Sequence, residues 1–283
     1  MSLTGIVDRE MRRISAGVTQ DASDSVVVEE PLEIRVGNET VGVTMRTPGQ
    51  DEILALGFLF GEGILDSSAD VSEVAYCGRP TDEGFGNSIR VSLAAGSRGR
   101  MDRVLAGRRW NVTTSACGVC GRRSIDDLLA RCPLLPKGPS VSERVIAQAV
   151  SRLRDLQPQF ASTGGMHAAG AFDAYGTLIA CFEDVGRHNA VDKVVGQLLR
   201  SGLVTASPQD RSRPGQPVFL VVSGRSSFEI VQKATTARIP IVASVSAASS
   251  LAIDLAQASG VTLAAFVRDG SLNVYANPER LVG

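Results

Sequence analysis

The fold class is indicated most clearly by the segment Val218-Phe-Leu-Val-Val-Ser-Gly-Arg-Ser-Ser-Phe-Glu-Ile-Val-Gln-Lys-Ala-Thr-Thr-Ala237. Residues 218–222 form an apolar run of strand length, a small polar loop follows, and the apolar spacing from Phe228 predicts a helix. The same pattern repeats over residues 241–258. Alternating strands and helices are typical of an α/β domain built on a parallel sheet.

The flanking segments extend this domain in both directions. We expect an amphipathic helix over 142–156, a hairpin of strands over 166–172 and 177–182, a helix over 190–199, and two last strands over 261–267 and 272–275. A proline-rich linker that begins at Pro133 precedes these elements. We therefore predict an α/β domain over residues 138–283.

The first half of the chain does not show this alternation of strands and helices. Residues 1–24 are polar and show no sustained period, which predicts a flexible arm. From residue 25 the pattern predicts an α+β domain that extends to residue 137. Its expected strands are 26–28, 32–36, 41–45, 71–76 and 89–94, and its expected helices are one that begins at Thr47-Pro48 and a short one over 101–105.

Composition excludes several classes of protein. The chain has 283 residues, of which 43% are hydrophobic and 21% charged, and its net charge is -1, so nucleic acid is not an expected partner. No apolar run reaches the ~18 residues of a membrane span, and the start has no signal-peptide core. Five cysteines, an odd number, fit a reducing compartment. We expect a cytoplasmic protein.

Three polar loops follow predicted strands of the second domain. They hold Arg187 and His188, Ser223 to Arg225, and Ser244 with Ser246. In an open α/β sheet such loops gather at one edge, where N–H groups and helix dipoles favour anions. The loops therefore predict a phosphate or nucleotide pocket, although none matches a P-loop or a GxGxxG fingerprint.

The chain has only two histidines, His167 and His188, and both lie in loops of the second domain. Asp184 is the residue expected to orient the ring of His188. Neither histidine stands in a sequence arrangement typical of a Ser-His-Asp triad, so hydrolase chemistry has no specific support from the sequence.

The motif Cys117-Gly-Val-Cys120 places two thiols within reach of each other. Arg122, Arg123 and a predicted helix start would favour the thiolate. Four interpretations are open: a buried apolar pair, a zinc site completed by Cys77 and Cys132, a thioredoxin-like dithiol, or a persulfide carrier in which Cys117 accepts the sulfur.

Five segments together resemble the formate dehydrogenase accessory sulfurtransferase family, FdhD. They are Thr114-Ser-Ala-Cys-Gly-Val-Cys-Gly121, Thr163-Gly-Gly-Met-His167, Glu183-Asp-Val-Gly-Arg-His-Asn-Ala-Val-Asp-Lys193, Ser223-Gly-Arg225 and Ser244-Val-Ser-Ala247. The Glu183 to Lys193 stretch and the cysteine motif are the specific parts, and the resemblance covers nearly all of the chain after the arm.

The resemblance implies a sulfurtransferase that carries persulfide sulfur from a cysteine desulfurase to the molybdenum bis(molybdopterin guanine dinucleotide) cofactor, bound as substrate, for a formate dehydrogenase. Cys117 and Cys120 would be the catalytic pair, in a homodimer with no metal of its own. The implied cofactor-binding residues are Phe266, Val267, Arg268, Asp269, Gly270 and Ser271, and we add Gly165, Met166, His167, Arg187, His188, Ser223, Gly224, Arg225, Ser244 and Ser246.

The resemblance also implies that the second domain has a three-layer α/β fold similar to cytidine deaminase. Deaminase chemistry is not expected, because His167-Ala168-Ala169 lacks the glutamate that deaminases need two residues after the histidine. Two other functions stay open: a non-catalytic cofactor chaperone with structural or zinc-bound cysteines, and a dithiol oxidoreductase.

Overall fold

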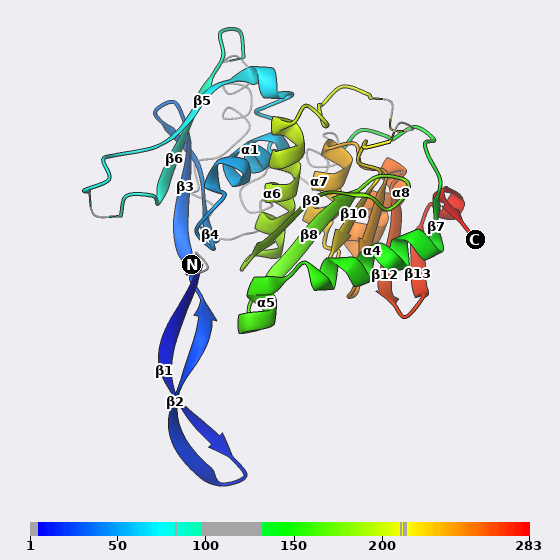
Figure 1. Ribbon diagram of the computed structural model, residues 1–283. Helices are drawn as coiled ribbons and strands as arrows, with labels where there is room; N and C mark the ends of the chain where they lie inside the picture. Colours follow the sequence, from blue (N-terminus) through cyan, green and yellow to red (C-terminus); the bar gives the residue numbers. More distant parts are fainter. Residues whose placement is uncertain (1–4, 83, 98–131, 210, 212–213) are drawn as a thin grey trace.

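The computed structural model describes residues 5–82, 84–97, 132–209, 211 and 214–283. A six-stranded sheet forms the centre of its second half (Figure 1). The strand order is β13-β12-β11-β10-β8-β9. β10, β11 and β12 are parallel to one another, and the other three strands run antiparallel to their neighbours. The strands are β8 (His167–Phe172), β9 (Leu178–Asp184), β10 (Phe219–Val222), β11 (Ile241–Ser244), β12 (Thr262–Arg268) and β13 (Ser271–Ala276).

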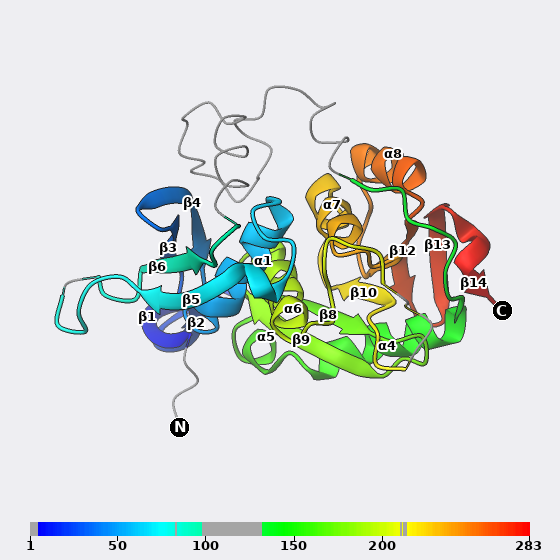
Figure 2. The ribbon, with the colours of Figure 1, turned by 90° about the horizontal axis from the view of Figure 1, so that it is seen from above.

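Helices cover both faces of this sheet, because its central strands are apolar on both sides. In β10, Leu220 and Val222 belong to one hydrophobic cluster, while Phe219 and Val221 belong to another. One face is covered by α4 (Glu143–Asp155), and the other by α6 (Arg187–Arg200), α7 (Phe228–Thr236) and α8 (Ser250–Ser259) (Figure 2). This confirms the predicted α/β class, with three layers in its second half.

The first half of the chain forms a four-stranded sheet with the order β4-β3-β6-β5. Its strands are β3 (Glu30–Val36), β4 (Glu39–Arg46), β5 (Val71–Tyr76) and β6 (Ser88–Leu93), with a short 3-10 helix at Ser68–Asp70 before β5. α1 (Asp51–Gly61) packs between this sheet and α6, and one hydrophobic cluster continues from β3 through α1 to α6. The two halves therefore share a core, and their division into two domains stays a prediction.

Two glycines let α1 and α6 approach each other closely. A Cβ at Gly57 would overlap the backbone carbonyl of Asp192, and a Cβ at Gly196 would overlap the carbonyl oxygen of Ile53. Each glycine thus faces the backbone of the opposite helix. A side chain at either position would push apart the helices that join the two halves.

The segment predicted as a flexible arm without regular structure instead forms a long hairpin, β1 (Ile6–Ser15) and β2 (Val18–Val27), that extends from the body (Figure 1). The expected boundary at residue 24 falls inside β2. The turn residues Ala16 and Gly17 both have positive φ, as two-residue hairpin turns require. The turn begins with alanine, whereas asparagine or aspartate is typical of such turns, so the sequence did not indicate it clearly. Both faces of the hairpin are exposed to solvent, so its strands lack the alternation of apolar and polar residues that indicates a strand.

Most other predicted elements are present within two or three residues of their expected bounds. α6 begins at Arg187 and not at residue 190, so its first turn contains the predicted loop residues. Unexpected elements are α5 (Pro158–Thr163), the pair β7 (Val141–Ser142) with β14 (Leu281–Val282), and a 3-10 helix at Pro278–Arg280. The helix expected over 101–105 lies outside the described residues, and the likeness to cytidine deaminase stays a prediction.

We predict that Gly57→Ala lowers the free energy of unfolding by about 1–3 kcal/mol, as overpacked cores do. Alanine is favoured over glycine by ~1 kcal/mol in an isolated helix, so a loss of stability shows that the overlap with Asp192 dominates. Urea denaturation measures the change. Gly138→Ala is the control, because its new Cβ meets nothing closer than 3.9 Å. Equal midpoints for the two variants would contradict the close helix approach.

Candidate functional site

The predicted loops gather at one edge of the six-stranded sheet. The start of β8 lies beside the end of β10, where the backbone N–H of Ala168 donates to Ser223 Oγ at 2.9 Å and the N–H of Ser223 donates to the carbonyl of Ala168 at 2.9 Å. His167 pairs in register with Asp184 at the end of β9. Because β11 and β12 run parallel to β10, their carboxyl ends reach the same edge.

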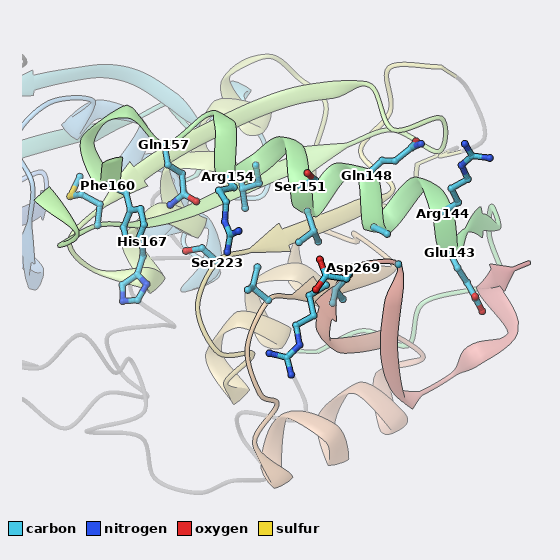
Figure 3. A pocket seen from close by; sticks show the side chains of 18 of the residues that line it. Glu143, Arg144, Gln148, Ser151, Arg154, Gln157, Phe160, His167, Ser223 and Asp269 are labelled. Carbon is cyan, nitrogen blue, oxygen red and sulfur yellow. The ribbon is translucent and has the colours of Figure 1, made fainter. Parts of the chain in front are cut away.

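A cavity of about 940 Å³ opens between this edge and α4 (Figure 3). Its volume is at the upper end of the usual range for ligand pockets. Eight of the predicted cofactor-binding residues line it: Gly165, Met166, His167, Ser223, Val267, Arg268, Asp269 and Gly270. Residues far apart in the sequence therefore meet in one cavity. Of the residues named in the three predicted anion-binding loops, Ser223 lines it and the others do not.

The other predicted residues lie around the cavity and do not line it. Gly224 packs against His167 and Arg187, since a Cβ there would lie 3.3 Å from His167 Nδ1 and 3.6 Å from Arg187 Cβ. Ser244 Oγ donates to the carbonyl of Ser246, which also accepts from the N–H of Phe266. His188 is buried beneath the edge, and Arg225 is exposed. Ser271 begins β13, immediately after the cavity turn.

The turn at the end of β12 has an unusual backbone. Phe266 and Asp269 have positive φ values of 54° and 50°, which non-glycine side chains rarely adopt, and the register of β12 against β13 shifts between Ala265 and Arg268. Such strain concentrates at ligand sites. The observation agrees with a functional role for the predicted segment 266–271.

Sequence reasoning missed the opposite wall of the cavity. The lining residues Arg144, Gln148, Ser151 and Arg154 recur every three or four positions and therefore share one face of α4. The polar half of an amphipathic helix is usually assigned to solvent, so only the repeated arginines could have indicated this role. Gln157 and Phe160 continue the wall beyond the helix.

The two ends of the cavity differ in chemistry. Arg154, His167 and Ser223 lie toward one end, and Glu143 and Arg144 lie at the other (Figure 3). Burial and the positive charges of Arg187 and Arg225 lower the pKa of His167 despite the opposing charge of Asp184. Its imidazole is thus neutral at pH 7, and arginine supplies the positive charge for an anionic ligand.

A buried ion pair holds this edge against the first half of the chain. Lys193 Nζ lies 2.8 Å from Asp184 Oδ2, and both side chains are 1% exposed or less. Asp184 Oδ1 accepts from the N–H of Gly186 at 2.8 Å and from Asn189 Nδ2 at 2.9 Å. Asn189 Nδ2 also donates to the backbone carbonyl of Met45 in β4, over a distance of 2.7 Å. The network fixes the start of α6, whose first turn carries Arg187 and His188.

The carboxylate of Asp184, which was expected to orient the ring of His188, instead contacts Lys193, Gly186 and Asn189 among the described residues. Two contacts of the ring are with α7 and its N-cap residue: His188 Nε2 lies 3.1 Å from Ser227 Oγ, and Nδ1 lies 3.4 Å from Glu229 Oε2. A Ser-His-Glu arrangement is therefore present in space, where the sequence showed none. The serine and the histidine are 39 positions apart, which hid the arrangement.

The predicted catalytic residues Cys117 and Cys120 lie outside the described residues. Within the described part of the chain, no cluster of three or more His, Cys, Asp or Glu residues is placed to hold a metal ion. The zinc interpretation needs the Cys117 and Cys120 pair and is therefore untested. Burial and the charge of Glu183 raise the pKa of Cys181 to about 11, so this thiol stays protonated at neutral pH.

No helix in the described part of the chain has the length and apolar character required to cross a membrane.

Comparison with known proteins gives consistent matches over most of the chain. The model of the FdhD/NarQ family matches residues 27–282. Proteins named sulfur carrier protein FdhD are similar: one of Anaeromyxobacter sp. (strain K) is 55% identical over 91% of this chain and 88% of its own, and one of Mycolicibacterium paratuberculosis is 45% identical over 96% and 97%.

A solved structure has the same fold. It is the crystal structure of a protein of Desulfotalea psychrophila described as a formate dehydrogenase accessory protein. The TM-score is 0.73 and the sequence identity 26%, and the match covers 98% of this chain and 100% of that one.

We predict that Arg187→Gln raises the pKa of His167, because it removes a nearby positive charge. NMR titration of the ring protons measures the shift, and Arg200→Gln on the exposed end of α6 is the control that leaves it unchanged. Since the pKa of His167 in the folded protein is below its unfolded value of 6.5, its contribution to stability declines as the pH falls through that value. An unshifted pKa in Arg187→Gln would contradict the described surroundings of His167.

Proposed function

The chain belongs to the FdhD/NarQ family, and from that premise we propose that it carries persulfide sulfur from a cysteine desulfurase to the molybdenum bis(molybdopterin guanine dinucleotide) cofactor of a formate dehydrogenase. The cofactor is bound as a substrate and not as a resident group. The exchange takes place in the cytoplasm, and the protein acts as a homodimer.

The names of the relatives support the sulfur part of this proposal. A relative that is 55% identical to the chain is called a sulfur carrier, and the structural neighbour is described as an accessory protein of formate dehydrogenase. The cysteine motif supplies the chemistry: the Cys117 thiolate attacks the outer sulfur of the desulfurase persulfide, the desulfurase thiolate leaves and takes up a proton, and Cys117 holds the transferred sulfur.

The observation that carries the cofactor part is the convergence of the predicted residues on one cavity. Segments 164–167 and 267–270 and Ser223 meet there, and α4 adds Arg144 and Arg154. Arginine forks suit the phosphates of a dinucleotide, and a cavity of about 940 Å³ suits a ligand of nucleotide size. These residues would hold one guanine nucleotide part of the substrate, while the cofactor supplies the metal that receives the sulfur.

Incubation with a cysteine desulfurase and cysteine tests the sulfur step. We expect mass spectrometry to detect a gain of about 32 Da, one sulfur atom, on the peptide that contains Cys117 and its loss after reduction. Cys181 is an internal control, because a thiol with a pKa of about 11 should stay unmodified. A protein that activates formate dehydrogenase without any such adduct would contradict the carrier.

Serine variants separate the carrier from the other functions. Cys117→Ser should abolish activation of formate dehydrogenase in a deletion strain, and Cys120→Ser shows whether the second thiol is required. Retained activation in both variants would favour a non-catalytic chaperone. Reduction of a model disulfide would favour a dithiol oxidoreductase, and zinc in the purified protein would favour a structural role for the cysteines.

A further inference from the structure

Ser227, His188 and Glu229 form a connected series of side chains that the proposed sulfur chemistry does not use. The imidazole of His188 lies between Ser227 Oγ, 3.1 Å from Nε2, and Glu229 Oε2, 3.4 Å from Nδ1. The second distance is long for a hydrogen bond, as is common in catalytic sites before a substrate binds. A carboxylate beside Nδ1 favours the tautomer with its proton there, which leaves Nε2 as the acceptor for the serine hydroxyl.

A buried ammonium group lies beside Glu229. Lys233, one turn later on α7, has Nζ 3.8 Å from Glu229 Oε1 and 2.7 Å from Asp192 Oδ1 on α6. All these carboxylate and ammonium groups are less than 12% exposed. α6 and α7 lie side by side on the sheet (Figure 1), so the order serine, imidazole, carboxylate and ammonium is built from two packed helices.

Ser227 occupies the N-cap position of α7, yet its side chain does not cap the helix. The equivalent residue after the next strand is Ser249, whose side chain accepts from the N–H of Ala252 in the usual way. The side chain of Ser227 therefore does not cap the helix as an N-cap serine usually does, and it contacts the imidazole of His188 instead. The first N–H groups of α7, which begins at Phe228, have no acceptor within the helix and directly follow Ser227 in the chain.

We propose that Ser227 is an activated nucleophile for acyl transfer, with His188 as its general base, Glu229 as the residue that positions the ring, and an ester or thioester as substrate. The Ser227 oxygen forms a bond to the acyl carbon while its proton moves to His188 Nε2. The bond to the leaving oxygen or sulfur breaks, and that atom takes the proton. Water then hydrolyses the acyl-serine through the same imidazole. The N–H groups at the start of α7 stabilise the oxyanion.

A fluorophosphonate probe tests the nucleophile in the unmodified full-length protein. The serine oxygen attacks phosphorus and fluoride leaves, which marks activated serines. We expect peptide mapping to find the probe on Ser227 and not on Ser249, although Ser249 is the more exposed of the two. Two helix N-cap serines of one protein are thereby compared without any substitution. Absence of the probe from Ser227, or equal modification of both serines, would overturn the proposal.

Variants test the role of the imidazole. His188→Gln should slow modification of Ser227 by about 10²-fold or more, the usual contribution of a general base. Ser249→Ala should leave the rate unchanged, and circular dichroism checks that each variant is folded. Hydrolysis of p-nitrophenyl acetate should be lost in Ser227→Ala. An unchanged rate of modification in folded His188→Gln would overturn the proposed role of the histidine. Because no sulfur step enters these measurements, their result is independent of the persulfide experiment.

Discussion

The buried ion pair between Asp184 and Lys193 ties the edge of the six-stranded sheet to the first half of the chain. A carboxylate without exposure to water is costly unless it is paired and hydrogen-bonded, and Asp184 satisfies its oxygens with an ammonium, a backbone N–H of its own segment and an amide side chain. Asn189 extends the network to β4. One charge therefore fixes the β9–α6 loop and joins it to the first half of the chain.

This edge of the sheet therefore supports two separate sites, the cavity and the pair of Ser227 and His188. The cavity lies between the edge and α4, while the serine and histidine pair lies between α6 and α7. Gly57 and Gly196 let α1 approach α6 closely, so the helix that carries His188 is fixed on both of its sides. The four-stranded sheet thus supports the site although none of its strands lines the cavity.

The sequence was sufficient for the strands of the six-stranded sheet and for the helices α4, α6, α7 and α8 to within a few residues, because short apolar runs bounded by small polar residues are typical of strands that lead into loops. It was insufficient where the signal is spatial. The polar face of α4 resembles an ordinary solvated face, and Glu229 lies 41 positions after His188, with no local pattern to connect them. The β1–β2 hairpin was missed because neither face is buried, and burial is what produces an alternating pattern.

We propose that the sheet edge and α4 together hold a guanine nucleotide part of the substrate. Hydrogen–deuterium exchange of the full-length protein, with and without guanosine diphosphate, tests it most directly. We expect slower exchange in segments 164–167 and 267–271 and no change around Leu135, Arg211 and Arg238, which line a separate cavity. Unchanged exchange at the sheet edge at millimolar nucleotide, or protection only around Arg211, would contradict it.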